Sequence, residues 1–147
     1  MDYQEYEEEV KKIEKKNEKY LKEFEKSMTE KKLSNRTIRK HLSNVDFYIN
    51  DYLNHYDPTE MEEGCYHLDG FLGDFFIRKC MWSTGNATKE TASSIKKFYK
   101  CMYELGHIEK DAYDYLCEEI KDSLDEWVDK VERYNDLDEE FDFFDFI

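Results

Sequence analysis

The sequence contains little of the two residues that interrupt helices, with one proline and five glycines in 147 residues. Proline breaks a helix interior and glycine weakens it, so their scarcity favours long, uninterrupted helices. The chain is long enough to bury the core of one domain. We therefore predict an all-α fold class: a single-domain helical bundle of about five helices, of which the first and the last are long.

The sequence also lacks a long hydrophobic run. No stretch approaches the roughly 18 apolar residues that a membrane span needs, and no apolar signal region follows the N-terminus. The four cysteines form no Cys-x-x-Cys pair, and each lies in or beside an apolar run. We therefore expect a cytoplasmic protein without membrane contact, whose cysteines are reduced and buried.

Motifs of catalysis and cofactor binding are missing as well. Cys65 and His67 are an isolated pair, because the other histidines lie far away in the sequence. No glycine-rich phosphate loop follows a strand, and no serine has the context of a nucleophile elbow. The carboxylates lie on charged helix faces, where nothing marks an acid–base pair. We expect no catalytic residues, no metal site and no cofactor, and hence a protein that is not an enzyme.

The net charge of -14 is unevenly distributed. Residues 1–33 carry 10 acids and 9 bases, and residues 34–110 carry 11 acids and 10 bases. Residues 111–147 carry 15 acids and only three bases. Contacts of Lys and Arg with phosphates supply most non-specific affinity for nucleic acids, so an acidic surface binds them poorly. This objection applies to the C-terminal quarter of the chain and not to its middle.

Both ends of the chain carry the apolar stripe of a long helix. The first stripe lies between Asp2 and Lys32 and has heptad spacing, with Asn17 at one of its apolar positions. The second lies between about Lys110 and Tyr134. We expect these two helices to pack antiparallel within one chain. The alternative is a coiled-coil homodimer in which Asn17 sets the register.

Three more helices are predicted between these two. Ser34 is expected to cap a helix that runs on to about Tyr56, where Asp57-Pro58 ends it. A short, very apolar helix covers residues 68–76. A further helix begins at Thr88, and Gly106 is expected to be its C-cap.

Two of these predicted helices carry motifs that resemble a known family. Leu33-Ser34-Asn35-Arg36-Thr37-Ile38 and the later Phe47-Tyr48-Ile49-Asn50-Asp51-Tyr52-Leu53 are similar to a Leu-Ser-x-x-Thr-Ile turn and an aromatic-Leu pattern. Ser94-Ile95-Lys96-Lys97-Phe98-Tyr99 and Gly106-His107-Ile108 are similar to a Thr/Ser-x-x-Ile-x-x-Phe-Tyr pattern and a Gly-Ile pair. All four patterns belong to the N-terminal core-binding (SAM-like) domain of phage-integrase-type tyrosine recombinases.

The resemblance covers about residues 20–127 and implies a helical domain that forms half of a DNA clamp. The catalytic residues of the recombinases have no counterpart in these motifs, so the resemblance does not imply cutting or rejoining of DNA. We expect a non-catalytic core-binding-like module that serves as an accessory DNA-binding protein and binds DNA weakly. The alternative is an acidic protein–protein interaction module or regulator that keeps the scaffold without binding DNA.

Basic residues gather near the same motifs, around the start of the second helix and on the polar side of the fourth. If these helices are neighbours, their cations and their Ser/Thr-capped N-termini face one surface that suits phosphate oxygens. Otherwise they are two ordinary solvated faces. The predicted nucleic-acid-binding residues are Lys32, Arg36, Thr37, Arg39, Lys40, Lys96, Lys97 and Lys100.

The predicted domain covers residues 1–135, and residues 136–147 form an acidic, aromatic tail. We expect Phe141 and Phe144 to enter an apolar groove while Asp142 and Asp145 meet lysines. Those lysines belong either to the domain's own basic face or to a basic partner protein. The alternative is an extension of the last helix that covers the core. The protein is expected to be a monomer or a homodimer.

Overall fold

The computed structural model describes the backbone of residues 1–146 and the side chains of residues 1–137. Helices make up 82% of the structure, and no strand occurs within the described residues. The predicted all-α fold class is therefore confirmed. No helix in this part of the chain combines the length and the apolar character that crossing a membrane requires.

The helical segments join into six continuous stretches within residues 1–146, because α2 runs into η1 and α3 runs through η3 into α4. One stretch more than predicted is present, the short η2. The segments are α1 (Tyr3–Glu30), α2 (Asn35–Asp46), the π-helix η1 (Phe47–Tyr52), the 3-10 helix η2 (Met61–Tyr66), α3 (Leu68–Gly70), the π-helix η3 (Phe71–Phe75), α4 (Phe76–Lys79), α5 (Gly85–Glu104) and α6 (Lys110–Phe146).

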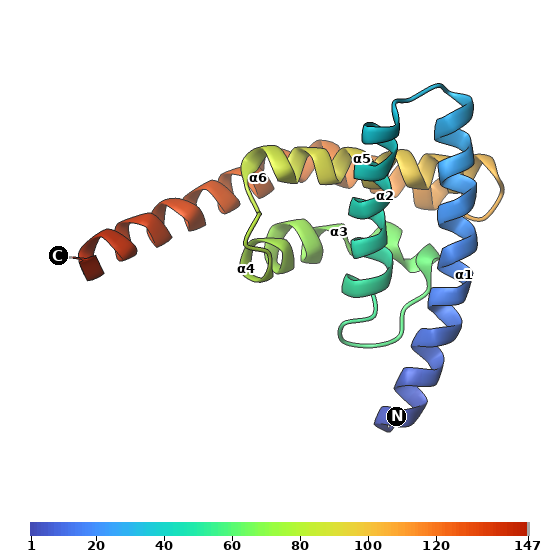
Figure 1. Cartoon of the computed structure of the whole chain (residues 1–147), viewed down its shortest axis with the longest axis horizontal. Helices are drawn as coiled ribbons and strands as arrows, with labels where there is room; N and C mark the ends of the chain where they lie inside the picture. Colours follow the sequence, from blue (N-terminus) through green and yellow to red (C-terminus); the bar gives the residue numbers. More distant parts are fainter. Residues whose placement is uncertain (147) are drawn as a thin grey trace.

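Two antiparallel helix hairpins dominate the architecture (Figure 1). α1 and α2 form one hairpin, and α5 and α6 form the other, which runs across the first. The stretch α3–η3–α4 packs against α6 and η1. This crossing places α2 directly against α5, so the two helices with the recombinase-like motifs are neighbours.

Side-chain caps explain where the middle helices begin. Ser34 Oγ accepts a hydrogen bond from the backbone N–H of Thr37 at 3.2 Å, which confirms the predicted cap. Thr84 caps α5 in the same way. Because of this cap, α5 begins at Gly85, before the predicted start at Thr88.

The α2–η1 stretch ends at Tyr52, a few residues before the predicted end at Tyr56. Asn54 explains the difference. Its Nδ2 donates to Asn50 O at 3.0 Å, and its Oδ1 accepts from the backbone N–H of Thr59 at 2.9 Å. These bonds satisfy backbone groups on both sides of the turn, so the chain leaves the helix before it reaches the proline.

α1 and α5 end with the same backbone motif. The residue after each C-cap has a positive φ, 61° at Lys32 and 80° at Gly106. The next N–H groups bond back to carbonyls in the last helical turn, as in a Schellman motif. Gly106 was predicted for this position, whereas the lysine at the end of α1 gave no such signal.

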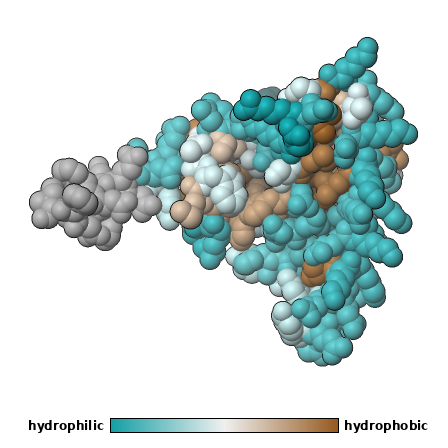
Figure 2. Space-filling model, in the orientation of Figure 1, coloured by the Kyte–Doolittle hydropathy of each residue, from teal (hydrophilic) through white to brown (hydrophobic). Residues whose placement is uncertain are grey.

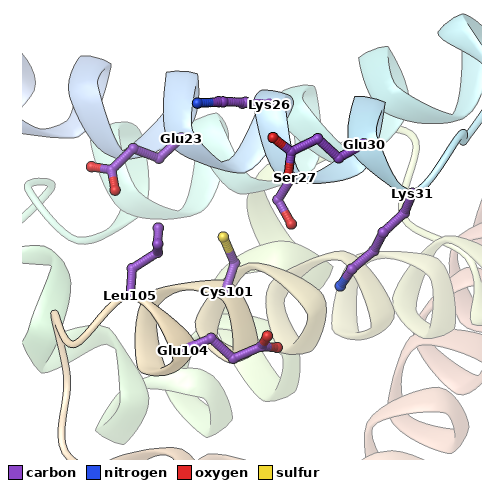
Figure 3. Close-up of a pocket in the computed structure, with 8 residues that line it drawn as sticks. All are labelled: Glu23, Lys26, Ser27, Glu30, Lys31, Cys101, Glu104 and Leu105. Carbon is purple, nitrogen blue, oxygen red and sulfur yellow. The ribbon is translucent and has the colours of Figure 1, made fainter.

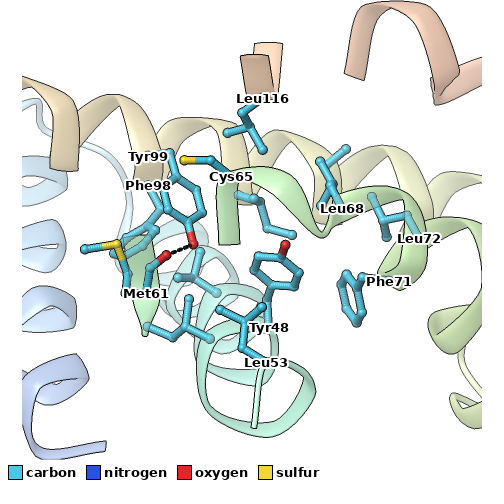
Figure 4. Close-up of a cluster of buried hydrophobic side chains, with 14 of the residues drawn as sticks. Tyr48, Leu53, Met61, Cys65, Leu68, Phe71, Leu72, Phe98, Tyr99 and Leu116 are labelled. Atoms are coloured by element: carbon cyan, nitrogen blue, oxygen red, sulfur yellow. Dashed lines mark hydrogen bonds between the residues drawn. The ribbon is translucent and has the colours of Figure 1, made fainter. Parts of the chain in front are cut away.

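The hydrophobic core lies where the two hairpins cross (Figure 4). Tyr48 and Tyr99 are fully buried there. The Tyr99 hydroxyl donates to Met61 O at 2.7 Å, and the Tyr48 hydroxyl donates to Gly64 O at 2.6 Å. Both carbonyls belong to η2, so the two tyrosines hold this irregular segment against the core.

The two long helices do not form the predicted pair. α1 makes its main contacts with α2, η1 and α5, whereas α6 packs on α5, η2 and the α3–η3–α4 stretch. The predicted antiparallel packing of the first helix on the last is therefore wrong. Only a few residues connect α1 to α2 and α5 to α6, so each long helix pairs with its neighbour in sequence.

Asn17 has a polar partner, but on η1 and not on α6. Its Nδ2 donates to Asn50 Oδ1 at 2.7 Å and to Ile49 O at 3.3 Å. Ile13 and Phe24, on the same stripe, are also buried within the chain. The stripe that would form the seam of a coiled-coil homodimer is thus already covered by the chain's own helices.

Candidate functional site

The polar side of α5 forms a groove with α2 in one half and with Lys31 and Tyr113 in the other. It consists of two adjoining hollows of about 300 and 330 Å³ that share Ser93. We call this surface the basic groove. It is lined in one half by Thr37, Lys40, His41, Lys89, Glu90, Ser93 and Ser94, and in the other by Lys31, Ser93, Lys96, Lys97, Lys100 and Tyr113.

The helical repeat explains why lysines line the basic groove. α5 buries Ile95 in the core, and the 3.6-residue period directs Lys96 and Lys100 to the opposite side. α2 buries Ile38, which leaves Lys40 at the edge that meets α5. The same pattern that builds the core therefore exposes the cations.

Most lysines of the basic groove have no carboxylate partner among the side chains of residues 1–137. Lys40 is the exception, because its Nζ lies 2.5 Å from Glu90 Oε1. Among the side chains that the structure describes, no carboxylate forms an ion pair with Lys31, Lys89, Lys96, Lys97 or Lys100. These cations are therefore available to an anionic ligand.

A polar cluster fastens α2 to α5 beneath the basic groove. Ser94 Oγ lies 2.7 Å from His41 Nδ1, accepts from Asn44 Nδ2 at 3.0 Å and donates to Glu90 O at 3.0 Å. Since the serine has one proton, His41 must donate through Nδ1. Ser94 is fully buried and its hydrogen-bonding capacity is used. The contact between serine and histidine thus suits a structural role and not an activated nucleophile.

Positive charge surrounds the His41 ring. Its pKa lies below the ordinary value, first because the ring is partly buried and then because Lys97 and Lys40 are near. Glu90 acts in the opposite direction but does not reverse the shift. The imidazole is therefore neutral at pH 7, and the lysines supply the positive charge of the groove.

The structure brings together five of the eight residues predicted for nucleic-acid binding. Thr37, Lys40, Lys96, Lys97 and Lys100 line the basic groove.

Lys32, Arg36 and Arg39 are exposed but do not line the basic groove. The structure adds His41, Ser93 and Tyr113, which carry no sequence signal because their role depends on which helices cross.

A larger hollow of about 520 Å³ lies between α1 and α5 and adjoins the basic groove at Lys31 (Figure 3). Three glutamates and two lysines line it, together with Cys101. Burial raises the pKa of the Cys101 thiol, which makes it a weak nucleophile at neutral pH. The mixed charges and the unactivated thiol give this hollow no evident chemistry.

All four cysteines are free thiols; three are buried, and Cys117 is partly exposed. Burial raises the pKa of Cys65 to about 12, so this thiol is protonated at neutral pH. Within the described part of the chain, no cluster of three or more His, Cys, Asp or Glu side chains is placed to hold a metal ion.

The backbone of the predicted tail continues α6 as far as Phe146 (Figure 1). The side chains of Phe141, Asp142, Phe144 and Asp145 lie outside the described residues, so their docking stays a prediction. Leu137 is the last described side chain, and it is 66% exposed. At this point α6 no longer covers the core.

Comparisons with models of protein families, with curated proteins and with solved structures found no match to this chain. The resemblance to the recombinase core-binding domain therefore remains an expectation from the sequence motifs. The basic groove, by its geometry and charge, is the feature of this chain that points to a function.

Proposed function

We propose that this protein is a non-catalytic DNA-binding module whose basic groove holds the phosphate backbone of a duplex. The observation that carries the proposal is the convergence of six lysines from α2, from α5 and from the end of α1 on one groove. Lysine contacts with phosphates supply most non-specific affinity for DNA. The hydroxyls of Thr37 and Ser93 can add hydrogen bonds to phosphate oxygens.

The recombinase resemblance supports the same surface. Its DNA-facing positions, carried over to this chain, include Thr37, Lys40, Lys96 and Lys97, and these line the basic groove. A single core-binding domain is half of a clamp, which suits an accessory protein that acts beside other DNA-binding proteins.

We expect the affinity for DNA to be low and steeply dependent on salt. The net charge of -14 opposes the approach of a polyanion. If the groove contacts about three to five phosphates, log K should fall against log salt concentration with a slope of about -2.7 to -4.5.

The test compares two pairs of substitutions that change the net charge equally. Lys97→Gln with Lys100→Gln removes two cations of the groove, and Lys11→Gln with Lys15→Gln removes two exposed lysines of α1. Anisotropy of a labelled DNA duplex at low salt should show roughly tenfold weaker binding for the groove pair and nearly unchanged binding for the control pair. Equal losses, or no binding by the unmodified protein, would overturn the proposal.

A third pair, Arg36→Gln with Arg39→Gln, separates the two grounds for the proposal. If the recombinase resemblance is right, these two arginines contact DNA and their loss weakens DNA binding. If the basic groove binds the DNA, this pair should change the affinity only slightly, because neither arginine lines the groove. A loss as large as that of the groove pair would move the DNA-binding surface to the exposed side of α2.

The second candidate function is an acidic interaction module that binds a basic partner protein and no DNA. The observation that favours it is the excess of acids in residues 111–147, 15 against three bases. The same titrations discriminate between the two, because this candidate requires that no salt-sensitive DNA binding occurs with any of the variants.

A further inference from the structure

A separate pocket of about 330 Å³ lies where η1, η3 and the loop before α5 meet. It is lined by the buried rings of Phe71 and Phe76, by the partly buried Phe47 and by the exposed Trp82. Exposed carboxylates stand at its edge, and no lysine or arginine lines it. We call it the aromatic-acidic pocket, and it is lined by Ser43, Asn44, Asp46, Phe47, Asp51, Phe71, Phe76, Trp82 and Thr91.

Two π-helical turns assemble the aromatic-acidic pocket. In η1 the N–H of Leu53 bonds to Tyr48 O, five residues back, and in η3 the N–H of Phe76 bonds to Phe71 O. Residues five apart lie on different sides of an α-helix, but the wider π turn brings them nearly above one another. The rings of Phe71 and Phe76 consequently lie 5.6 Å apart.

Two carboxylates five residues apart, Asp46 and Asp51, also line the pocket. The pKa of Asp51 is raised, chiefly by partial burial and further by the nearby carboxylates of Asp46 and Glu14. Asp46 accepts a hydrogen bond from Asn50 Nδ2 at 2.6 Å. Neither aspartate has an ion-pair partner among the side chains that the structure describes. The pocket thus holds uncompensated negative charge beside aromatic rings.

Trp82 stands open to the solvent at the edge of the aromatic-acidic pocket. Its side chain is 59% exposed, and its ring meets the Phe47 ring at 74° with centroids 5.8 Å apart. Met81, beside it, is fully exposed. Figure 2 shows a mostly hydrophilic face on which paler and apolar side chains gather beside α2. Large exposed apolar groups bordered by charge are typical of interaction sites.

We propose that the aromatic-acidic pocket binds an arginine side chain from a basic segment of a partner protein. The guanidinium group stacks on an aromatic face and presents several N–H donors to carboxylates. Its aliphatic stem packs on the phenylalanine rings. One arginine side chain thus contacts both the aromatic rings and the carboxylates of the pocket. This site is distinct from the basic groove, and the proposal does not require DNA binding.

The test uses a labelled peptide of alternating arginine and glycine and the same peptide with citrulline, which keeps the shape and removes the charge. Anisotropy should show binding of the arginine peptide and at least tenfold weaker binding of the citrulline peptide. Asp51→Asn and Trp82→Ala should each weaken binding about tenfold. Asp122→Asn, an equal charge change on an exposed part of α6, should have little effect.

Several results would overturn the proposal. Equal losses for Asp51→Asn and Asp122→Asn would mean general attraction to an acidic protein. Unchanged binding by Trp82→Ala would show that the guanidinium group does not stack on Trp82. Equal binding of a lysine–glycine peptide and the arginine–glycine peptide would lead to the same conclusion. A homodimer that Trp82→Ala dissociates in sedimentation would show that a second copy fills the pocket. Circular dichroism should show that each variant is folded, because all three substituted side chains are exposed.

Discussion

At the scale of single residues, Lys32 adopts a conformation that suits glycine. Its φ is 61°, and its place after the C-cap of α1 matches that of Gly106 after α5. A side chain with a Cβ disfavours this left-handed conformation by roughly 1–2 kcal/mol. α1 therefore ends with a local strain that α5 avoids.

We expect Lys32→Gly to raise the free energy of unfolding by about 0.5–1 kcal/mol. The substitution relieves the left-handed strain, and the greater freedom of glycine in the unfolded chain offsets part of the gain. Urea denaturation measures the difference. The matched control is Gly106→Ala, which should lower the free energy of unfolding by about 1 kcal/mol. A loss of stability in the lysine variant would contradict the prediction.

At the scale of elements, the contact between α2 and α5 contains a histidine that is neutral at pH 7. His41 has a lowered pKa in the fold, and its ordinary value is 6.5. Below about pH 6.5 the unfolded chain therefore binds a proton more readily than the fold does, and acidification favours unfolding. Stability returns as the pH rises above this value. Partial burial of the ring lowers the His41 pKa most, Lys97 and Lys40 lower it further, and Glu90 raises it.

We expect His41→Gln to reduce the loss of stability between pH 7.5 and pH 5.5. Glutamine does not titrate in this range, and its amide can still donate to Ser94 Oγ. The measurement is the free energy of unfolding at several pH values. His67→Gln, at an exposed position, serves as the control for the loss of one histidine. Parallel pH curves for the His41 variant and the unmodified protein would refute the prediction.

The apolar stripes predicted the buried side of each long helix but not its partner. Ile13, Phe24 and Leu116 are buried as the spacing requires. The stripes of α1 and α6 are alike in period, so sequence alone did not show that each packs on other helices. Short connections gave the better signal, because they favour pairs of consecutive helices. The π turns of η1 and η3 were not predicted from the sequence.

At the scale of the whole molecule, the last described side chains of α6 are exposed. Tyr134 is 42% exposed and Leu137 is 66% exposed. Asn135 Nδ2 donates a hydrogen bond to Ser83 O at 2.9 Å. Among the described residues, this is the last side-chain hydrogen bond that joins α6 to another segment. Truncation after Asn135 therefore keeps this contact.

We expect removal of residues 136–147 to change the melting temperature by no more than about 2–4 °C. The truncation also removes six acids, so DNA binding at low salt should become stronger. Thermal unfolding and DNA titration measure the two effects. A large fall in melting temperature would mean that the tail covers the core.

The control for the truncation keeps the charge and removes the aromatic groups, with Phe141→Ser and Phe144→Ser. If the tail docks on the basic groove through its aromatic residues, this control should strengthen DNA binding as much as the truncation does. Unchanged DNA binding would assign the effect to charge alone.

Helix content, the Ser34 cap, the Gly106 turn and the cations of the middle helices were readable from the chain, because each depends on neighbours within about one helical turn. The meeting of Lys40 with Lys96 and Lys97, the Ser94 cluster and the aromatic-acidic pocket were not. Each joins residues from segments that are far apart in sequence, and their distance depends on which hairpins form and how they cross. The periodicity of the sequence specifies which face of each helix is buried. Which other helix packs on that face depends on how all the side chains fit together in one core.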